Sequence, residues 1–377
     1  MKFRVERDAL ADAVTWAARS LASRPTLPVL AGLLLTVDGD QLRVSGFDLE
    51  ASTEVDLEVT AGAPGQALVS GRLLADITRA LPPHPVDVTV DGSRLTISCG
   101  AARFTLPGMP VDDYPKLPSM PTTAGTVDGA EFAAAVGQVA IAAGRDDTLP
   151  MLTGVRLEID GDRLTLAATD RYRLAVRELS WKPDDATAAG AQVLVPARTL
   201  ADAAKSLAHS ESLTISLAAG GAGEGIIGFS GTNGGRASRA TTRLLDATFP
   251  AYRSLLPNEW ASSAEVAVDP LVAAVKRVAL VTDRNAPVRM EFADGTVSLT
   301  AGGDDEGRAE EQLEVTYDGD PITTAFNPQF LLDGLGALAT GTARMLFTSS
   351  TKPVVLRPEA ADGAEYTYLI MPVRLPG

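Results

Sequence analysis

Two aspartates, Asp48 and Asp170, are the side chains in this sequence whose type and placement come nearest to supporting chemistry. A pair of carboxylates can serve as general acid and general base, which is the arrangement that many hydrolytic reactions require. Each Asp, however, follows its own apolar hairpin pattern, at an equivalent position of two similar stretches. A short polar side chain placed there commonly fixes the turn after the hairpin. We therefore favour a structural role, and acid–base catalysis by Asp48 and Asp170 stays as an alternative.

Other chemical signals are weak. Cys99 is the single cysteine and His84 and His209 are the two histidines, so there is no internal disulfide and no metal-ligand cluster of the usual spacing. We expect Cys99 to be a buried core residue. There is no phosphate-binding Gly-rich loop, nucleophile elbow or His-Glu-x-x-His motif. The acidic stretch 302–311 lacks the alternating ligands of a calcium loop. The sequence thus predicts no catalytic residue, no metal and no cofactor.

The two aspartates belong to an internal repeat that organises the chain. Both copies run through alternating apolar residues into an Asp-Gly-Asp turn and out again, the pattern of a hairpin with one buried face. A third, weaker copy lies at 288–301, where Val155, Leu164 and Leu166 correspond to Val288, Val297 and Leu299. The matched residues of the first copy are Pro28, Gly32, Asp38, Gly39, Leu42 and Asp48, which recur 122 positions later as Pro150, Gly154, Asp160, Gly161, Leu164 and Asp170.

Each copy also contains two predicted helices. The first helix of the chain begins near Asp8 and places Leu10, Val14, Ala17 and Leu21 on one face. The second helices share an Asp five residues before a closing Leu, as Asp76 and Leu81, Asp202 and Leu207, and Asp333 and Leu338. We therefore expect an α+β fold of three repeated domains, each with two helices packed on sheets. A proline-rich linker near Met120 and the segment before Asn258 divide them into residues 1–121, 122–257 and 258–377.

The amino-acid composition indicates the broad class of protein to which the chain belongs. With 377 residues, 45% hydrophobic and 21% charged, the chain should be globular and exceed one ordinary core. No apolar run reaches membrane-spanning length, and the N-terminus carries charges where a signal peptide needs an apolar core, so we expect a cytoplasmic protein.

The net charge of −15 argues against nucleic acid only if the basic residues are scattered. They are not: Arg72 and Arg79 face only Asp76, and Arg198 and Lys205 face only Asp202 on the second helices. This repetition favours a shared basic surface over ordinary solvated helix faces.

Several motifs, spread in order over the whole chain, then carry a family resemblance. MKFRVERDAL, RPTLPVLAGLLL, ATDRYRLAV, FPAYRSLLP and YLIMPVRL resemble the beta sliding clamp, the beta subunit of bacterial DNA polymerase III. The resemblance implies a head-to-tail homodimer whose six similar domains close a ring, with helices lining the hole and sheets outside. Such a ring encircles double-stranded DNA without reading sequence and performs no chemistry. Its implied partners are the polymerase III catalytic subunit, the clamp loader, and other polymerases and repair proteins that bind through short peptides.

The resemblance also implies three groups of site residues. The DNA-facing surface takes Arg24, Arg72 and Arg198. Ring closure takes an apolar contact between Phe104 and Leu106 on one edge and Leu280 and Val281 on the other, with Arg103 near Glu310 and Glu311. The partner-peptide pocket takes Leu152, Thr169, Tyr172, Arg173, Leu174, Pro250, Leu255, Asn327, Phe330, Thr351, Met371, Pro372, Val373 and Arg374. Here Arg173 and Arg374 are expected to hold peptide carbonyls or a carboxylate.

The chain departs from the family pattern at a few positions. Arg308 stands in an interface loop that is commonly acidic, Arg171 and Tyr172 replace a frequent Gly-His pair, and Pro376 and Gly377 extend the C-terminus. Besides the enzyme, a second alternative is a solitary three-domain peptide-binding module that never encircles DNA.

Overall fold

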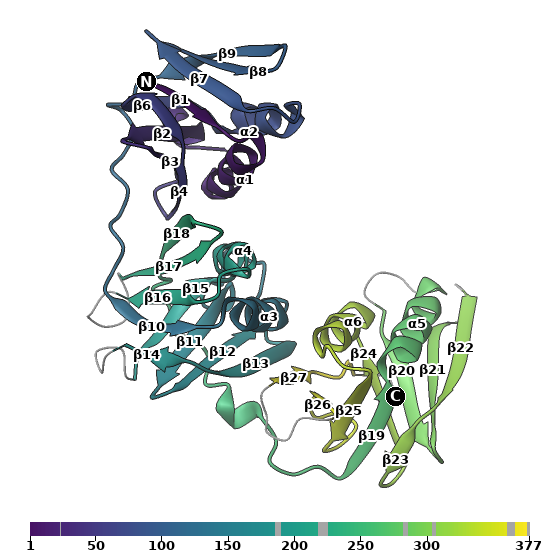
Figure 1. Ribbon diagram of the computed structural model, residues 1–377. Coiled ribbons are helices and arrows are strands. Elements are labelled where there is room, and N and C mark those ends of the chain that lie inside the picture. The colour runs from purple at the N-terminus through teal and green to yellow at the C-terminus, as the bar shows by residue number, and fades with distance from the viewer. Residues whose placement is uncertain are drawn as a thin grey trace. The chain divides into compact units, whose positions relative to one another are not determined.

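The computed structural model describes residues 1–22, 24–184, 190–217, 225–281, 286–303, 307–359 and 366–374. The chain falls into two compact units (Figure 1). Unit 1 comprises Met1–Ala133, Asp160–Asp162 and Ser180–Asp246, and unit 2 comprises Ala134–Ile159, Arg163–Leu179 and Ala247–Gly377. Each unit mixes helices with antiparallel strands, as the α+β prediction requires. No helix in the described part of the chain is long and apolar enough to cross a membrane.

Unit 1 is built on one 14-stranded sheet with the order β14-β10-β16-β17-β18-β4-β3-β2-β6-β9-β8-β7-β1-β5. Its strands are β1 (Lys2–Val5), β2 (Gly32–Asp38), β3 (Gln41–Phe47), β4 (Ala51–Glu58), β5 (Thr60–Ala63), β6 (Gly65–Ser70), β7 (Val86–Asp91), β8 (Arg94–Cys99), β9 (Ala102–Met109), β10 (Thr123–Val127), β14 (Lys182–Pro183), β16 (Leu213–Leu217), β17 (Ile226–Asn233) and β18 (Arg236–Arg243). The strand β15 (Gln192–Pro196), the helices α1 (Arg7–Ala17), α2 (Gly71–Ala80) and α4 (Ala197–Leu207), and the 3-10 turns η1 (Ala18–Ser20) and η2 (Pro28–Ala31) complete it. Helix α3 (Gly129–Ala140) runs from unit 1 into unit 2.

Unit 2 contains two groups of strands. One has the order β11-β12-β13-β27-β26-β25-β19-β23 and the other is the separate sheet β22-β21-β20-β24. The strands are β11 (Gly154–Asp160), β12 (Arg163–Thr169), β13 (Arg173–Ser180), β19 (Ser262–Ala267), β20 (Val288–Ala293), β21 (Thr296–Gly303), β22 (Gly307–Glu314), β23 (Thr316–Asp318), β24 (Ile322–Phe326), β25 (Thr342–Phe347), β26 (Val354–Pro358) and β27 (Tyr366–Ile370). The helical elements are α5 (Val268–Val278), α6 (Pro328–Ala337), η3 (Pro150–Leu152), η5 (Arg253–Leu255) and η6 (Ala279–Val281).

The repeated hairpins form as the sequence predicts. Strands β2 and β3 are joined at Gly39 and strands β11 and β12 at Gly161, whose φ values are 55° and 58°. The third copy turns at Gly295, with φ 74°, between β20 and β21. Glycine adopts this left-handed conformation without the steric cost that a side chain brings, so the Asp-Gly pattern fixes all three turns.

Helix α1 differs from its prediction at the C-terminal end. It buries Leu10, Val14 and Ala17, but the α-helix ends at Ala17 and Leu21 lies beyond it in extended backbone. The chain tightens into η1, where the Ser20 hydroxyl donates a hydrogen bond to the Ala17 carbonyl at 3.2 Å. That hydroxyl satisfies one of the carbonyls left free at the helix end.

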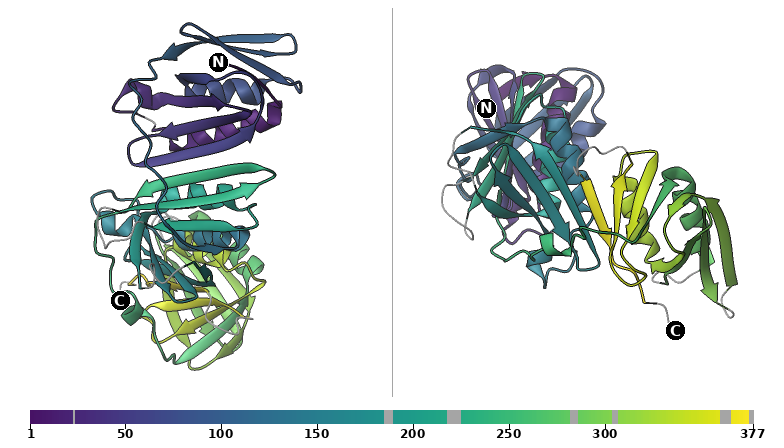
Figure 2. Two further views of the ribbon diagram at one scale, coloured as in Figure 1. Left: turned by 60° about the vertical axis from the view of Figure 1, so that its left-hand side comes forward. Right: turned by 90° about the horizontal axis from the view of Figure 1, so that it is seen from below.

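The second helices match the prediction more closely. Helices α2, α4 and α6 contain the recurring Asp76, Asp202 and Asp333. Their closing leucines, Leu81, Leu207 and Leu338, are all buried. The three helices are therefore amphipathic in the same register. Within unit 1, α1 and α2 pack on strands of the first repeat and α4 packs on β17 and β18; in the left view of Figure 2 the helices of this unit lie behind its sheet.

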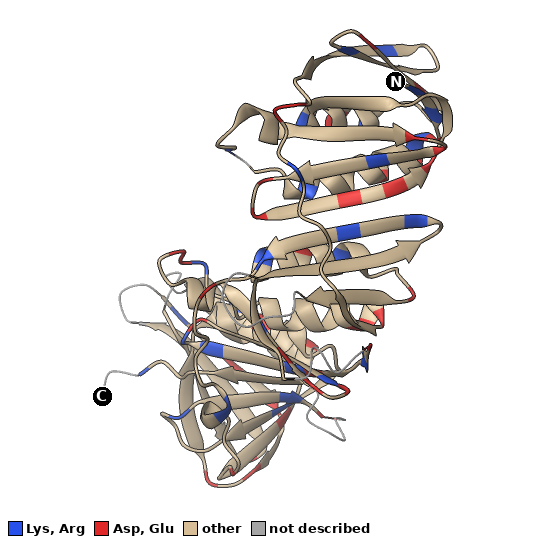
Figure 3. Cartoon of the chain, turned by 90° about the vertical axis from the view of Figure 1, so that its left-hand side faces the viewer, with Lys and Arg blue, Asp and Glu red and all other residues tan. Residues whose placement is uncertain are grey.

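The first two repeats share the sheet of unit 1 through the pairing of β4 with β18. The seam runs from Ala51 opposite Thr242 to Asp56 opposite Ala237. Figure 3 shows acidic positions on β4 facing basic positions on β18. Arg239 of β18 pairs with Asp56, whose side chain is only 12% exposed, and lies 3.8 Å from Glu54. Complementary charge thus reinforces the backbone hydrogen bonds of the seam.

Cys99 ends β8 and is buried as predicted. Its thiol donates to the carbonyls of Pro82 and His84 at 3.3 and 3.2 Å. It packs as a small core residue with a satisfied thiol.

Candidate partner-binding and DNA-facing sites

Asp48 and Asp170 each fix the turn that follows a hairpin. Asp170 Oδ1 accepts the backbone N–H groups of Tyr172 and Arg173 at 3.0 Å each, and Asp48 Oδ1 accepts those of Glu50 and Ala51 at 3.0 and 2.7 Å. The residue after each Asp has a left-handed backbone, with φ 81° at Leu49 and 80° at Arg171. These carboxylates hold a strained turn in place by hydrogen bonding. The structural interpretation of the pair is confirmed.

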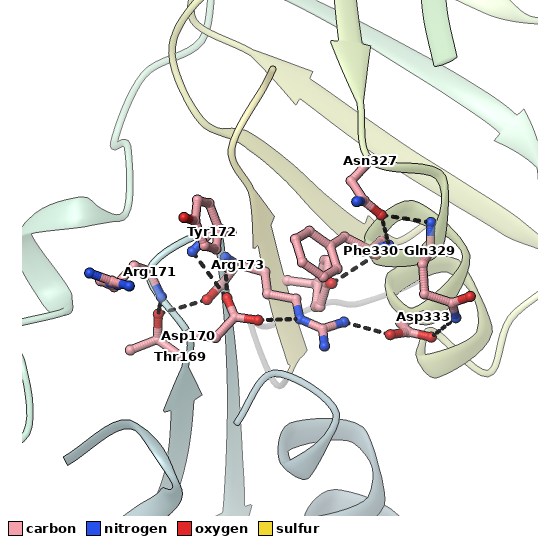
Figure 4. Close-up of polar contacts among 10 residues, drawn as sticks. Thr169, Asp170, Arg171, Tyr172, Arg173, Asn327, Gln329, Phe330 and Asp333 are labelled. Carbon is pink, nitrogen blue, oxygen red and sulfur yellow. Dashed lines mark hydrogen bonds and ion pairs between the residues drawn. The ribbon is translucent and has the colours of Figure 1, made fainter. Parts of the chain in front are cut away.

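Arg173 begins β13 and is the most buried cation at the candidate pocket, with 6% of its surface exposed. Its Nε donates to Asp170 Oδ2 at 2.9 Å and its Nη1 to Asp333 Oδ2 at 2.5 Å, so it connects the repeated turn to helix α6 (Figure 4). The guanidinium also lies 4.4 Å from the centroid of the Phe330 ring. Burial acts to lower the pKa of Arg173, but Tyr368, Asp333 and Asp170 raise it by more, so the pKa is held above its ordinary value.

These contacts change the expected role of Arg173. A guanidinium that is buried and bonded to two carboxylates of its own chain has little left to offer a peptide carbonyl. The expectation that Arg173 holds the peptide directly does not fit this geometry. Its position instead fixes the Phe330 ring and the loop that carries Tyr172.

The surface beside Arg173 is apolar and exposed. Tyr172 is 56% exposed and stacks on Phe330 at a centroid distance of 6.2 Å and an interplanar angle of 26°. Its carbonyl accepts the Met371 N–H at 2.8 Å, and Met371 is 37% exposed. This Tyr172–Phe330–Met371 surface can bury an apolar side chain of a ligand.

Helix α6 orients Phe330 through its cap. Asn327 Oδ1 accepts the N–H groups of Gln329 and Phe330 at 2.9 and 3.2 Å (Figure 4). Gln329 Nε2 in turn donates to Asp333 Oδ1 at 2.7 Å, and the Tyr368 hydroxyl donates to the Phe330 carbonyl at 2.8 Å. An Asn cap of this kind stabilises the first turn of a helix, and here it also fixes a pocket wall.

Besides Arg173, three of the predicted pocket residues are internal. Leu152 and Leu174 are 6% and 1% exposed, so they pack beneath the surface. Thr169 is also buried, and its hydroxyl donates to the Arg173 carbonyl at 2.6 Å while accepting the Arg171 N–H at 3.2 Å. These residues support the pocket from below.

The remaining predicted pocket residues lie on the segments around this surface. Leu255, in η5, is 51% exposed, and Thr351 and Arg374 are exposed as well. Pro250, Pro372 and Val373 are half-buried, and the Val373 N–H donates to the Ala325 carbonyl at 2.8 Å. Pro376 and Gly377 lie outside the described residues.

A buried charge cluster anchors the segment that carries Pro250 and Leu255. Glu158, 8% exposed, pairs with Arg156 at 2.6 Å and with Arg253. The Tyr252 hydroxyl donates to Glu158 Oε2 at 3.3 Å, and burial together with this carboxylate raises the pKa of Tyr252 to about 12. Sequence reasoning missed Glu158.

Asp333 and Tyr368 were also missed. The recurrence of Asp in all three second helices was a signal for Asp333, although only the fold brings it to Arg173 across 160 positions of sequence.

The three arginines expected to face DNA are all exposed and all lie in unit 1. Arg72 lies in α2 and Arg198 in α4, while Arg24 follows η1. Arg72 and Arg198 line one cavity, which Arg19 lines too. Arg19 was not among the residues assigned to DNA.

The two edges expected to close a ring are open strand edges in the described chain. Residues 102–107 of β9 pair only with β8, and β22 pairs only with β21. Open edges present unpaired N–H and C=O groups to any strand that can reach them.

The side chains at these edges are unequal. Phe104 and Val281 are half-buried, Arg103 is exposed and Leu280 is 82% exposed. Leu106 is 1% exposed, which leaves it a core position with little surface for a partner.

The acidic residues of β22 already have partners within the chain. Glu311 accepts from Arg277 Nε at 3.0 Å, and Glu310 lies 3.7 Å from Arg308. The hydrogen bond from Arg277 holds the pKa of Glu311 below its usual range. Arg103 would have to compete with these ion pairs.

Comparison with known proteins agrees with this architecture. Residues 1–118, 126–251 and 253–374 match the family models of the N-terminal, central and C-terminal domains of the DNA polymerase III beta subunit. The chain is 55% identical over 381 residues to the beta sliding clamp of Streptomyces coelicolor, with 100% of each chain covered. It is 48% identical to that of Micrococcus luteus over 84% of this chain and 100% of the relative. A crystal structure of the Pseudomonas aeruginosa sliding clamp bound to griselimycin has a TM-score of 0.89 and 28% identity, and covers 100% of both chains.

The chain therefore belongs to the DNA polymerase III beta subunit family, the beta sliding clamps of DNA replication. Members of this family are processivity factors and not enzymes. The prediction of a three-domain α+β fold is confirmed. The alternative in which Asp48 and Asp170 act as acid–base catalysts is not retained.

Proposed function

We propose that two copies of this chain close head to tail into a ring that encircles duplex DNA in the cytoplasm. The ring holds replication proteins on DNA through the Tyr172–Phe330–Met371 surface and the segments around it. Its partners are the polymerase III catalytic subunit, the clamp loader, and other polymerases and repair proteins that carry short apolar peptides.

The two open strand edges carry this proposal. A head-to-tail contact joins two different edges of the protein, so β9 of one copy of the chain meets β22 of the other copy. Pairing these strands satisfies backbone groups that no other described strand satisfies, and it leaves no free edge of this type in a closed dimer. Leu280 supplies an exposed apolar side chain beside the contact.

DNA binding follows from the helical surface. Arg24, Arg72 and Arg198 are exposed and can neutralise phosphates without reading bases, which is what a sliding ring needs. Acidic residues elsewhere keep DNA from binding the outside.

Partner binding follows from a rigid apolar surface. Tyr172 and Phe330 are stacked, and Arg173 and the Asn327 cap fix their position, so little side-chain entropy is lost when a peptide docks. Because a clamp relative binds griselimycin, this compound is a ready probe. We expect Tyr172→Ala to weaken griselimycin binding about ten-fold, the effect of removing one exposed aromatic contact. The exposed Arg94→Ala variant on β8 serves as the control.

The decisive experiment is retention on DNA. The clamp is loaded onto a nicked circle by a clamp loader, and the bound fraction is followed before and after the circle is linearised. Retention on the circle with rapid loss from the linear form is expected from topological linkage. Equal behaviour on both forms would favour the solitary peptide-binding module, and the ring would have to be withdrawn.

A further inference from the structure

The junction of the first two repeats, inside unit 1, is built from the same parts as the Arg173 junction inside unit 2. In unit 1, β4 follows the Asp48 turn and pairs with β18, with Ala51 opposite Thr242. In unit 2, β13 follows the Asp170 turn and pairs with β27, with Arg173 opposite Ile370. Each junction is covered by a second helix, α4 or α6, at the positions of Asp202 and Asp333. The two junctions are thus quasi-equivalent, residue by residue.

The two junctions carry different side chains at two equivalent positions. Ala51 stands at the position of Arg173, and Thr199 at the position of Phe330. In unit 2 the long side chain of Arg173 places its guanidinium over the Phe330 ring and fills the junction. In unit 1 the small side chains leave a cavity of about 450 Å³ that Ala51, Thr199 and Asp202 line. A cavity of this size lies in the range of ligand pockets.

Three arginines surround this cavity, namely Arg19, Arg72 and Arg198. Arg19 Nη1 donates to the Asp202 carbonyl at 3.2 Å, and Arg72 Nη2 donates to the Ala22 carbonyl at 3.4 Å. Within the described ranges none of the three is ion-paired with a carboxylate. Guanidinium groups held beside a cavity without a counter-ion recognise carboxylates strongly, often through two hydrogen bonds.

Three hydroxyl groups of the lining already have hydrogen-bond partners. The Ser20 and Thr53 hydroxyls bond to each other at 2.8 Å, and the Ser52 hydroxyl bonds to Thr241 at 2.6 Å. Apolar contact comes from small and medium side chains, including Leu21, Ala203 and Ala240, and from Trp16. A fitting ligand therefore brings negative charge to the rim and a small apolar side chain to the interior.

We propose that this cavity, the unit 1 junction pocket, is a second peptide site that takes a short acidic segment of a partner protein. The inference rests on the proposed function, since it transfers peptide binding from one junction to its quasi-equivalent. Arg72 and Arg198 at the rim also face DNA in the proposed ring, whereas the cavity beneath them accepts an inserted side chain, which a duplex does not supply.

The test uses the full-length protein and a phage-displayed library of random eight-residue peptides. Selected peptides are synthesised, and their affinities are measured by fluorescence anisotropy against three variants. Thr199→Phe fills the unit 1 junction pocket with the side chain that α6 carries at the same position, without changing charge. Arg198→Ala removes one rim cation, and Arg94→Ala, at an exposed position of β8, removes a cation outside the lining as the matched control.

If the proposal holds, the library yields a class of peptides rich in Asp and Glu. The affinity of these peptides for the protein falls at least ten-fold in Thr199→Phe and in Arg198→Ala. Their affinity stays unchanged in Arg94→Ala and in Tyr172→Ala. Peptides that respond to Tyr172→Ala alone report on the unit 2 pocket, so failure of the proposed function shows separately.

Two outcomes overturn the proposal. One is the absence of any peptide class sensitive to Thr199→Phe. The other is a fall in affinity for a duplex oligonucleotide in Thr199→Phe with no peptide effect, which would assign the unit 1 junction pocket to DNA. Circular dichroism of each variant checks folding, and the solvent-exposed Arg198→Ala keeps the test valid if Thr199→Phe folds poorly.

Discussion

Removing the Asp333 carboxylate tests whether Arg173 holds the two sides of the peptide pocket together. The side chains of Arg173 and Asp333 are 7% and 27% exposed, and their hydrogen bond is 2.5 Å long. Breaking a buried ion pair costs about 3–5 kcal/mol, and a hydrogen bond to a charged group contributes about 1.5–3 kcal/mol. Arg173 keeps Asp170, and Asp333 is partly solvated, so we expect Asp333→Ala to cost about 2 kcal/mol.

The assay has to be local, because a protein of several domains need not unfold in one step. Hydrogen exchange followed by mass spectrometry reports the opening of β13 and β27 directly. A cost of about 2 kcal/mol corresponds to opening that is roughly thirty-fold more frequent at both strands. Griselimycin or a partner peptide should bind more weakly as well, since Arg173 is held less firmly over the Phe330 ring.

Controls separate the charge from the side-chain volume. Asp333→Asn keeps an acceptor and should lose about half as much. Arg173→Met removes the buried cation, so adding Asp333→Ala to it should cost little further. Asp76→Ala breaks an exposed pair with Arg79, 70% and 61% exposed, and should change nothing measurable. If Asp333→Ala alters exchange at β13 by less than about three-fold, the reasoning about a buried connection is wrong.

Three further predictions concern the seam, the acidic edge and the dimer. Arg239→Ala removes one of the two arginines paired with buried Asp56, and Arg43 remains. Exchange at β4 and β18 should therefore rise by an amount equivalent to about 1.5 kcal/mol while β13 is unaffected, and equal protection in both proteins would mean that the seam depends on backbone pairing alone. Because the pKa of Glu311 is depressed, its contribution to stability is present at neutral pH and is lost as the pH falls from the ordinary Glu value through the lower folded-state value. Glu311→Gln should therefore melt earlier than the wild type at pH 7, and the difference should shrink as the pH falls below about 4.3, the ordinary pKa of Glu; a difference that stays constant on acidification would contradict the assignment. Leu280→Asp should leave the circular dichroism spectrum of the folded protein unchanged, since Leu280 is 82% exposed, but should shift sedimentation from dimer to monomer; a dimer of undiminished affinity would exclude Leu280 from the contact.

The sequence allowed the local structure of the repeats to be predicted well. Asp-Gly at Gly39 and Gly161 determines a turn within a few residues, and the alternation around it determines which face is buried. The role of Asp48 and Asp170 followed from the same local reasoning. The C-terminal end of α1 could not be predicted in this way. The Ser20 hydroxyl bonds to the Ala17 carbonyl where the helix ends, and helix propensity does not reveal such a contact.

The site was harder to predict because its key contacts are distant in sequence. Arg173 looked like a ligand-binding cation until the fold placed Asp333 beside it. Apolar positions were equally ambiguous: Leu106 and Leu174 read the same as Leu255 and Leu280 in the sequence, yet the first two are buried and the last two exposed. Periodicity shows that one face of a strand is apolar, but it does not show whether its own domain covers that face.

The open edge of β22 has a consequence for how the protein is made. Roughly 200 residues separate β9 from β22, so at 5–20 residues per second about 10–40 seconds pass between the emergence of the two edges from the ribosome. During that interval β9 is available to the completed β22 of an older copy, and neighbouring ribosomes on one messenger hold such copies close. Arg308, Glu310, Gln312 and Glu314 stand exposed on β22, and this polar row resists stacking into fibres while the strand waits. Assembly during translation would thus be a natural route to the proposed dimer, and the charge on β22 would limit aggregation of the chain until its partner arrives.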